Sequence, residues 1–214
     1  MSQITAAMVK ELRERTGQGM MDCKKALEEA GGDIEKAIDD MRAAGAIRAA
    51  KKAGNIAAEG SVAIKMADDG KSATIIEVNS QTDFLALQDD FKAFVAESLD
   101  IAASKGYTDA APLIEERESA REQLVSKTGE NVNIRRLARI EGAVLGAYQH
   151  GNRIGAIVCL EGGDVELARD IAMHVAASNP QVVNPEDVSE DVVAKEKEIF
   201  MQRNEDKIQG KPEN

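Results

Sequence analysis

An internal duplication is the feature that most constrains the fold of this chain. One copy begins at Gly60 and the other at Gly142, and each continues through two short apolar runs that flank a glycine-containing turn. The runs end at Val78 in one copy and at Leu160 in the other, after the same number of residues. Alternating apolar residues around turn residues predict a β-hairpin. We therefore expect two similar hairpins, each followed by a helix that ends in Ala-Ala-Ser.

The two copies differ in the connection between hairpin and helix. The connection after Val78 is eight residues longer than the one after Leu160, and the added residues include Thr82, Asp83 and Phe84. A connection longer than its counterpart is a frequent place for function. The residues alone also allow Asp83 to be a helix N-cap and Phe84 to be a core residue.

Composition limits the possible classes of function. The chain has 214 residues, a formal net charge of −11 and a pI near 4.8. Such an acidic surface disfavours sequence-specific nucleic-acid binding and anionic membranes, because phosphate binding depends on cationic side chains. No apolar run is long enough to span a bilayer and no signal peptide is evident, so we expect a cytoplasmic protein. Cys23 and Cys159 are isolated, which indicates neither a disulfide nor a metal site.

Residues 1–44 predict three short helices, with Thr5 as the N-cap of the first and Asp33 as the N-cap of the third. Met20 and Met21 stand at a glycine-flanked turn, where they suit either an adaptable contact surface or core filling. Basic residues among Ala and Gly in residues 42–53 fit a solvated helical linker better than a nucleic-acid patch.

The predicted fold class is α+β, with a three-helix module, two antiparallel-sheet-plus-helix subdomains and a protruding C-terminal helix. The expected divisions are 1–53, 54–140, 141–180 and 181–214. The second subdomain has no counterpart of the third strand predicted after Gly129. A polar last helix is expected from about Glu186. These two features suggest a fragment whose missing strand comes from residues beyond 214.

The sequence has no phosphate-binding loop, no nucleophile elbow and no paired metal-ligand spacing. His150 lies at a predicted hairpin tip, where it is exposed, and His174 lies on a predicted helix as a structural residue. No nucleophile is placed near them, so an enzyme is a weak hypothesis.

Several stretches resemble the bacterial translation elongation factor Ts family. One of them is Asn-Ser-Gln-Thr-Asp-Phe at residues 79–84, and the others are residues 9–17, 19–27, 148–151 and 171–178. The resemblance covers the chain from Ile4 to about Val193. Leu85 departs from it conservatively, since the family often has Val there. The family also continues beyond the last residues of this chain.

The resemblance implies a guanine-nucleotide exchange factor for the GTPase elongation factor Tu, without cofactor or nucleotide site of its own. Thr82, Asp83, Phe84 and Leu85 would displace Mg²⁺ from the partner by pressing on the helices beside the Mg²⁺ site. His150 would contact the same region.

Further partner contacts implied by the resemblance are Arg13, Met20 and Met21 of the N-terminal module. A helix-binding interaction module without exchange activity is the alternative. In that case the duplicated sheets serve only as a scaffold.

Overall fold

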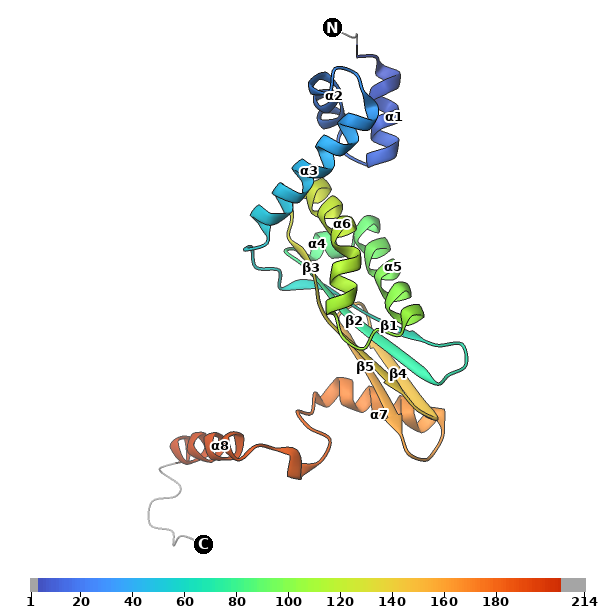
Figure 1. Ribbon diagram of the computed structural model, residues 1–214. Helices are drawn as coiled ribbons and strands as arrows, with labels where there is room; N and C mark the ends of the chain where they lie inside the picture. Colours follow the sequence, from blue (N-terminus) through green and yellow to red (C-terminus); the bar gives the residue numbers. More distant parts are fainter. Residues whose placement is uncertain (1–3, 205–214) are drawn as a thin grey trace, which may run out of the picture. The chain divides into compact units, whose positions relative to one another are not determined.

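The computed structural model describes residues 4–204, and it has the predicted α+β architecture (Figure 1). The described residues form eight α-helices, one 3-10 helix and five strands. The helices are α1 (Ala6–Thr16), α2 (Met20–Glu29), α3 (Ile34–Lys52), α4 (Asp83–Ala86), α5 (Asp89–Lys105), α6 (Ala111–Thr128), α7 (Val165–Ser178), η1 (Pro185–Asp187) and α8 (Glu190–Arg203). The strands are β1 (Glu59–Met66), β2 (Ser72–Ser80), β3 (Val132–Glu141), β4 (Val144–His150) and β5 (Ile154–Leu160).

Helices α1 and α3 begin at the predicted capping residues, whereas α2 follows Gly19 without a side-chain cap. The Thr5 hydroxyl accepts a hydrogen bond from the backbone N–H of Met8, and the Asp33 carboxylate accepts one from Lys36 at 3.0 Å. Each cap satisfies a backbone donor that the first helical turn leaves without a partner. The apolar faces of the three helices then enclose a small core, made of Val9, Leu12, Cys23, Ala26, Leu27, Ala30 and Ala37.

Helix α3 confirms that the linker expected at residues 42–53 is largely helical, but one of its faces is packed and not solvated. It runs without a break to Lys52 and packs against α6, with Gly45 and Ala49 buried. A Cβ at Gly45 would lie 3.5 Å from the Cβ of Ser126, so small residues let the two helices come close. The basic side chains of this segment remain on its exposed side.

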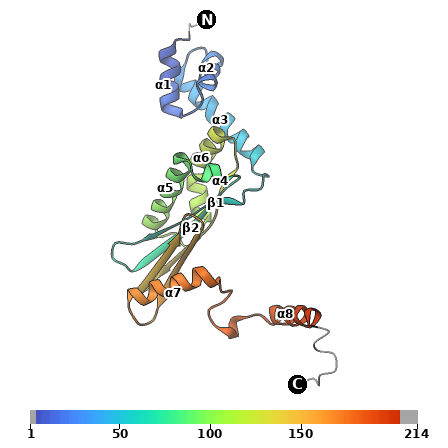
Figure 2. The same cartoon turned by 180° about the vertical axis from the view of Figure 1, so that it is seen from behind.

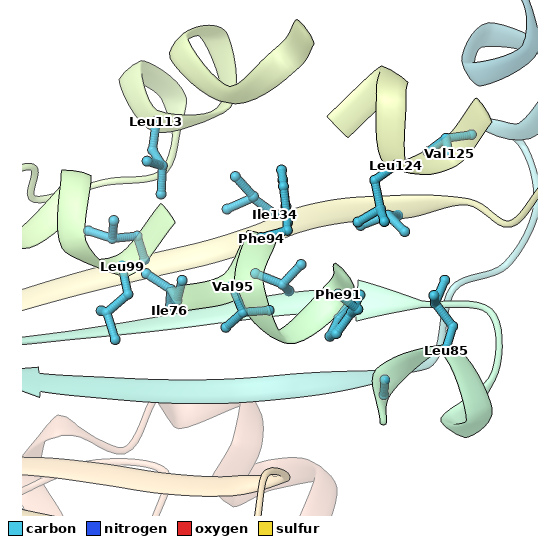
Figure 3. Close-up of a cluster of buried hydrophobic side chains, with 14 of the residues drawn as sticks. Ile76, Leu85, Phe91, Phe94, Val95, Leu99, Leu113, Leu124, Val125 and Ile134 are labelled. Atoms are coloured by element: carbon cyan, nitrogen blue, oxygen red, sulfur yellow. The ribbon is translucent and has the colours of Figure 1, made fainter. Parts of the chain in front are cut away.

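The larger sheet is antiparallel with the order β1-β2-β3, so β2 is its middle strand. Helices α5 and α6 cover one face of the sheet and enclose the main core with it (Figure 3). The core is aliphatic apart from two phenylalanines, and its largest members include Phe91, Phe94, Leu99, Leu113, Ile76 and Leu124.

The β4–β5 hairpin covers the opposite face of the larger sheet. A Cβ at Gly155 would meet the side chains of Val62, Ile64 and Ile75, all on the face turned away from α5 and α6. Helix α7 packs on the far side of the hairpin, and the two views agree in placing the strands between α5 and α7 (Figures 1 and 2). The part of the chain from β1 to α7 thus stacks helices, sheet, hairpin and helix in succession.

The duplication is visible in the order of the elements. The β1–β2 hairpin is followed by α5 and the β4–β5 hairpin by α7, and the longer first connection contains α4. Within residues 4–204 the hairpin β4–β5 is a two-stranded sheet with no third strand. The four-part domain division stays a prediction.

The chain divides into two compact units, and the boundary along the sequence lies between Ala176 and Ala177, near the end of α7. In the second unit, the last helix begins at Glu190 and not near Glu186 as expected. Pro185 to Asp187 form a separate 3-10 turn, and Ser189 caps α8 by accepting from the N–H of Val192. None of the residues of α8 is buried, as its polar sequence predicts. Ile208, expected in the same helix, lies outside the described residues.

We expect Gly146→Ala to lower the free energy of unfolding by about 1–3 kcal/mol, because overpacking displaces neighbouring elements. A Cβ there would lie 2.2 Å from the carbonyl carbon of Ala168, so α7 has to move away from β4. Denaturant unfolding monitored by circular dichroism measures the change. Gly162→Ala is the matched control, since a Cβ at Gly162 meets nothing within 4 Å. Equal stability of the two variants would contradict the close helix–hairpin contact.

Candidate functional site

Helix α4 has one face buried in the core and exposes an aromatic side chain to solvent on the other. Phe84 is 76% exposed and its neighbour Leu87 is also exposed, whereas Leu85 is 1% exposed and Ala86 is buried. Leu85 belongs to the main core, at the end where Phe91 also lies (Figure 3). One short helix therefore anchors itself with Leu85 and Ala86 and exposes Phe84. A large exposed apolar group next to a second one is typical of a contact surface.

The start of α4 is held by a carboxylate from a distant part of the chain. The backbone N–H and the hydroxyl of Thr82 both donate to Glu130, at 3.0 and 2.8 Å. The same hydroxyl accepts from the N–H of Leu85 at 3.2 Å, which makes Thr82 the N-cap. Gly129 has a φ of 75°, and this left-handed turn after α6 allows Glu130 to reach Thr82. Charge-assisted bonds of this kind are stronger than neutral ones, so the base of the loop is rigid.

The structure decides several alternatives that the sequence left open for this loop. Thr82 and not Asp83 is the N-cap, and the Asp83 side chain is exposed in the first helical turn. Phe84 is a surface residue and not part of the core. Leu85 is buried, because its side chain lies on the face of α4 that completes the core. Its expected action on the partner stays a prediction.

His150 is exposed at the tip of the β4–β5 hairpin. Its Nδ1 lies 3.3 Å from the Tyr148 hydroxyl, and the two rings are stacked with centroids 6.4 Å apart. The hairpin tip is fastened to the start of β1, where Arg153 pairs with Glu59 at 2.6 Å. Glu59 is the register partner of Ser80, the last residue of β2. The tip with His150 and the loop after β2 therefore lie at the same end of the larger sheet.

A β-bulge near this end gathers arginine side chains. Glu77 pairs with Arg136 while Val78 pairs with Ile134, so Arg135 is the extra residue. Both arginines bind the Glu77 carboxylate. Burial raises the pKa of Glu77, but hydrogen bonds from Asn79 and Arg136 outweigh it and hold the pKa below its ordinary value. The carboxylate thus stays ionised and keeps both guanidinium groups on one side of β3.

A second exposed apolar surface lies on the N-terminal module. Met20 and Met21 are 59% and 73% exposed, so neither is core filler. They line a groove of about 370 Å³ between α1 and α2 whose edges carry three cations. The lining residues are Ile4, Thr5, Ala6, Val9, Lys10, Arg13, Met20, Met21 and Lys24. Flexible methionines beside cations suit a partner helix with apolar and acidic side chains.

Sequence reasoning missed the residues that hold the α4 loop in place. Glu130 and Asn131 lie between α6 and β3, and Asn131 is 4% exposed. The available signal was two adjacent polar residues between a helix-ending glycine and a buried strand. Sequence spacing does not show that they meet residues 81 and 82. No group of three or more His, Cys, Asp or Glu side chains within residues 4–204 is arranged to hold a metal ion.

Comparison with known proteins gives consistent matches. The family model described as Elongation factor TS matches residues 81–214. Elongation factor Ts from Azotobacter vinelandii is 74% identical over 214 residues, which are 100% of this chain and 74% of the relative. Proteins of the same name from Pseudomonas aeruginosa (strain LESB58) and Pseudomonas putida (strain GB-1) are 75% and 71% identical over the same shares. No helix in the described part of this chain is long and apolar enough to cross a membrane.

We expect Thr82→Ala to lower the free energy of unfolding by about 1–2 kcal/mol, through loss of the N-cap and of one bond to Glu130. The matched control is Thr82→Ser, which keeps the hydroxyl and should stay within about 0.5 kcal/mol of the wild type. Urea unfolding of the three proteins measures the difference. A serine variant as unstable as the alanine variant would show that the hydroxyl is not what holds α4.

Proposed function

The chain belongs to the elongation factor Ts family, and we propose that it is a guanine-nucleotide exchange factor for the GTPase elongation factor Tu. In this proposal it binds the GTPase during translation elongation in the cytoplasm, displaces Mg²⁺ and promotes the release of GDP. It is not an enzyme in the usual sense, and the nucleotide site belongs to the partner. The observation that carries the proposal is the exposed ring of Phe84 on an immobilised loop, within the stretch that resembles the family.

Exchange requires a preference for one state of the partner. A binding protein shifts an equilibrium only by the difference between its affinities for the two states. The factor must therefore bind the nucleotide-free GTPase more tightly than the GDP-bound form. A side chain that fills a gap present only in the nucleotide-free form supplies this difference, and an aromatic ring buries a large area with few rotatable bonds.

The α4 loop has the properties that such a wedge needs. Phe84 and Asp83 face outward, whereas Thr82 and Leu85 hold the loop from below through Glu130 and the core. In GTPases of this type Mg²⁺ is held by the phosphate-binding loop and nearby carboxylates. Mg²⁺ demands near-ideal octahedral geometry, so a small displacement of the supporting helices weakens its binding. A rigid base ensures that the partner, and not the loop, is displaced.

His150 and the N-terminal groove would supply further contacts. His150 lies at the same end of the larger sheet as the α4 loop, which fits a contact to the same region of the partner. Arg13, Met20 and Met21 would hold another helix of the GTPase in the groove. Two surfaces on one chain raise each other's effective concentration.

The alternative is a helix-binding module without exchange activity. The N-terminal groove favours it, because exposed methionines beside cations can bind an amphipathic helix with no role for Phe84. Measuring GDP release from elongation factor Tu together with binding separates the two functions. Binding without faster release would support the alternative.

We expect Phe84→Ala to reduce stimulated GDP release by about 30-fold or more, because loss of a central aromatic anchor typically costs about 2 kcal/mol or more. The variant should keep the wild-type unfolding midpoint, since the ring is exposed. Stopped-flow release of a fluorescent GDP analogue and thermal unfolding measure the two effects.

Ile47→Ala is the matched control for Phe84→Ala. Ile47 is an exposed apolar residue on α3, and its truncation should leave GDP release within about twofold of wild type. Near-normal release by Phe84→Ala would contradict the wedge, and a lower unfolding midpoint would mean that the ring supports the fold.

We also expect the double variant Met20→Ala and Met21→Ala to raise the concentration needed for half-maximal GDP release by about tenfold, with a maximal rate within about twofold. Met173→Ala, an exposed methionine on α7, is the control. A titration of the release rate gives both parameters. Deleting residues 1–53 is a poorer test, because it removes Ala49 from the main core. A large fall in maximal rate would assign the groove a part in displacing GDP.

A further inference from the structure

A polar node lies directly beneath the α4 loop, in which Asn131 is buried, Gln81 is half-buried and Asn55 is exposed. The side-chain oxygen of Gln81 accepts the backbone N–H of Asn131 at 2.7 Å and the side-chain N–H of Asn55 at 3.2 Å. The Asn131 side chain donates in turn to the carbonyl oxygens of Asn55 at 2.8 Å and Ala53 at 3.4 Å. Gln81 is thus an acceptor for two segments that are distant from it in sequence.

The node joins three parts of the fold. Ala53 and Asn55 directly follow α3, which comes from the N-terminal module. Gln81 directly precedes Thr82, the N-cap of α4. Asn131 follows Glu130, whose carboxylate binds Thr82. The side-chain bonds that Gln81 and Thr82 make to distant parts of the chain therefore lead either to the end of α3 or to the turn after α6.

The core can form without the hydrogen bonds between Gln81, Asn131 and Asn55. Leu85 and Ala86 already bury the inner face of α4, and a purely apolar contact could close the remaining gap without leaving a polar group unsatisfied. Buried polar groups that are fully satisfied instead favour one geometry over nearby alternatives, because any shift leaves donors without acceptors. The Asn131 side chain, nearly inaccessible to solvent, has this property.

We propose that Gln81 and Asn131 are positioning residues that set the Phe84 wedge and couple it to the end of α3. The coupling rests on the proposed function, since it links the groove on the N-terminal module with the wedge. A partner helix that fixes α3 also fixes the carbonyl groups of Ala53 and Asn55, and through Asn131 the position of α4. Binding at the groove thereby favours the loop geometry that displaces Mg²⁺.

The test compares two substitutions of similar size at Gln81. Gln81→Leu removes the acceptor and leaves the N–H groups of Asn131 and Asn55 without it. Gln81→Glu keeps an acceptor oxygen for both. Asn55→Ala removes only the donor on the α3 side and leaves the Asn55 carbonyl group in place. Hydrogen exchange of the free chain reports on the loop, with the Leu85 and Gln88 amides as probes because they are bonded within α4 and its end.

We expect Gln81→Leu to speed exchange of these amides about tenfold, the factor that corresponds to 1.4 kcal/mol. Asn55→Ala should change the same amides in the same direction, and Gln81→Glu should restore slow exchange. With elongation factor Tu, Gln81→Leu should lower the maximal GDP-release rate about tenfold and leave the half-saturating concentration within about twofold. If Gln81 merely stabilised the fold, Gln81→Leu would lower the unfolding midpoint and would not reduce the maximal rate while leaving the half-saturating concentration unchanged.

Unchanged amide exchange in Gln81→Leu overturns the positioning role, whatever happens to GDP release. Faster loop exchange in Gln81→Leu but not in Asn55→Ala overturns the coupling to α3. Faster exchange with an unchanged maximal rate overturns the link between loop position and GDP release. If the wild-type chain does not stimulate GDP release from elongation factor Tu, the proposed exchange function fails. The structural role of the node still stands if amide exchange in the variants changes as expected.

Discussion

The central strand β2 is the constraint on which the rest of residues 4–176 depends. It pairs with β1 on one side and β3 on the other, and its two faces are covered by α5 and α6 and by the β4–β5 hairpin. Its backbone therefore has no freedom to shift register without exposing Ile76 and Val78. The chain leaves β2 at Ser80 from a fixed point. The residues that follow within a short distance, including the α4 loop, therefore start from a fixed position.

Phe84 shows what this fixed exit allows. An isolated helix as short as α4 has no stability of its own in water. It exists here because Leu85 and Ala86 are buried, Thr82 is bound to Glu130 and Gln81 is bound to Asn131. Because these contacts hold the backbone, the fold does not depend on burial of the Phe84 ring, and the ring can remain in solvent. Phe84 can thus be exposed because the burial of Leu85 and Ala86 and the hydrogen bonds of Gln81 and Thr82 already hold the backbone around it.

Local signals in the sequence predicted the secondary structure well, and long-range pairings limited the rest. Thr5 and Asp33 were identified as caps, and the duplication identified both hairpins, because these patterns involve residues a few positions apart. Glu130 lies 48 residues from Thr82 and could not be assigned to it from spacing. The burial of Leu85 could not be read from spacing for the same reason, since the core that receives it includes residues of later helices. The site residues implied by family resemblance are surface residues except Leu85 and the half-buried Thr82.

In the proposed function, charge and tethering would let an acidic chain bind its partner through cationic patches. The net charge of −11 disfavours general binding to nucleic acid. The groove of the N-terminal module nevertheless has Lys10, Arg13 and Lys24 at its edges, and the Glu77 bulge keeps two arginines near the other end of the sheet. Local cations within an acidic surround select for a partner surface with acidic groups at matching positions and repel a uniformly acidic one. Because α3 packs against α6, contacts at the groove would, in the proposed function, raise the local concentration of the α4 loop at its target. The distance between the two surfaces would then help to determine which partners fit.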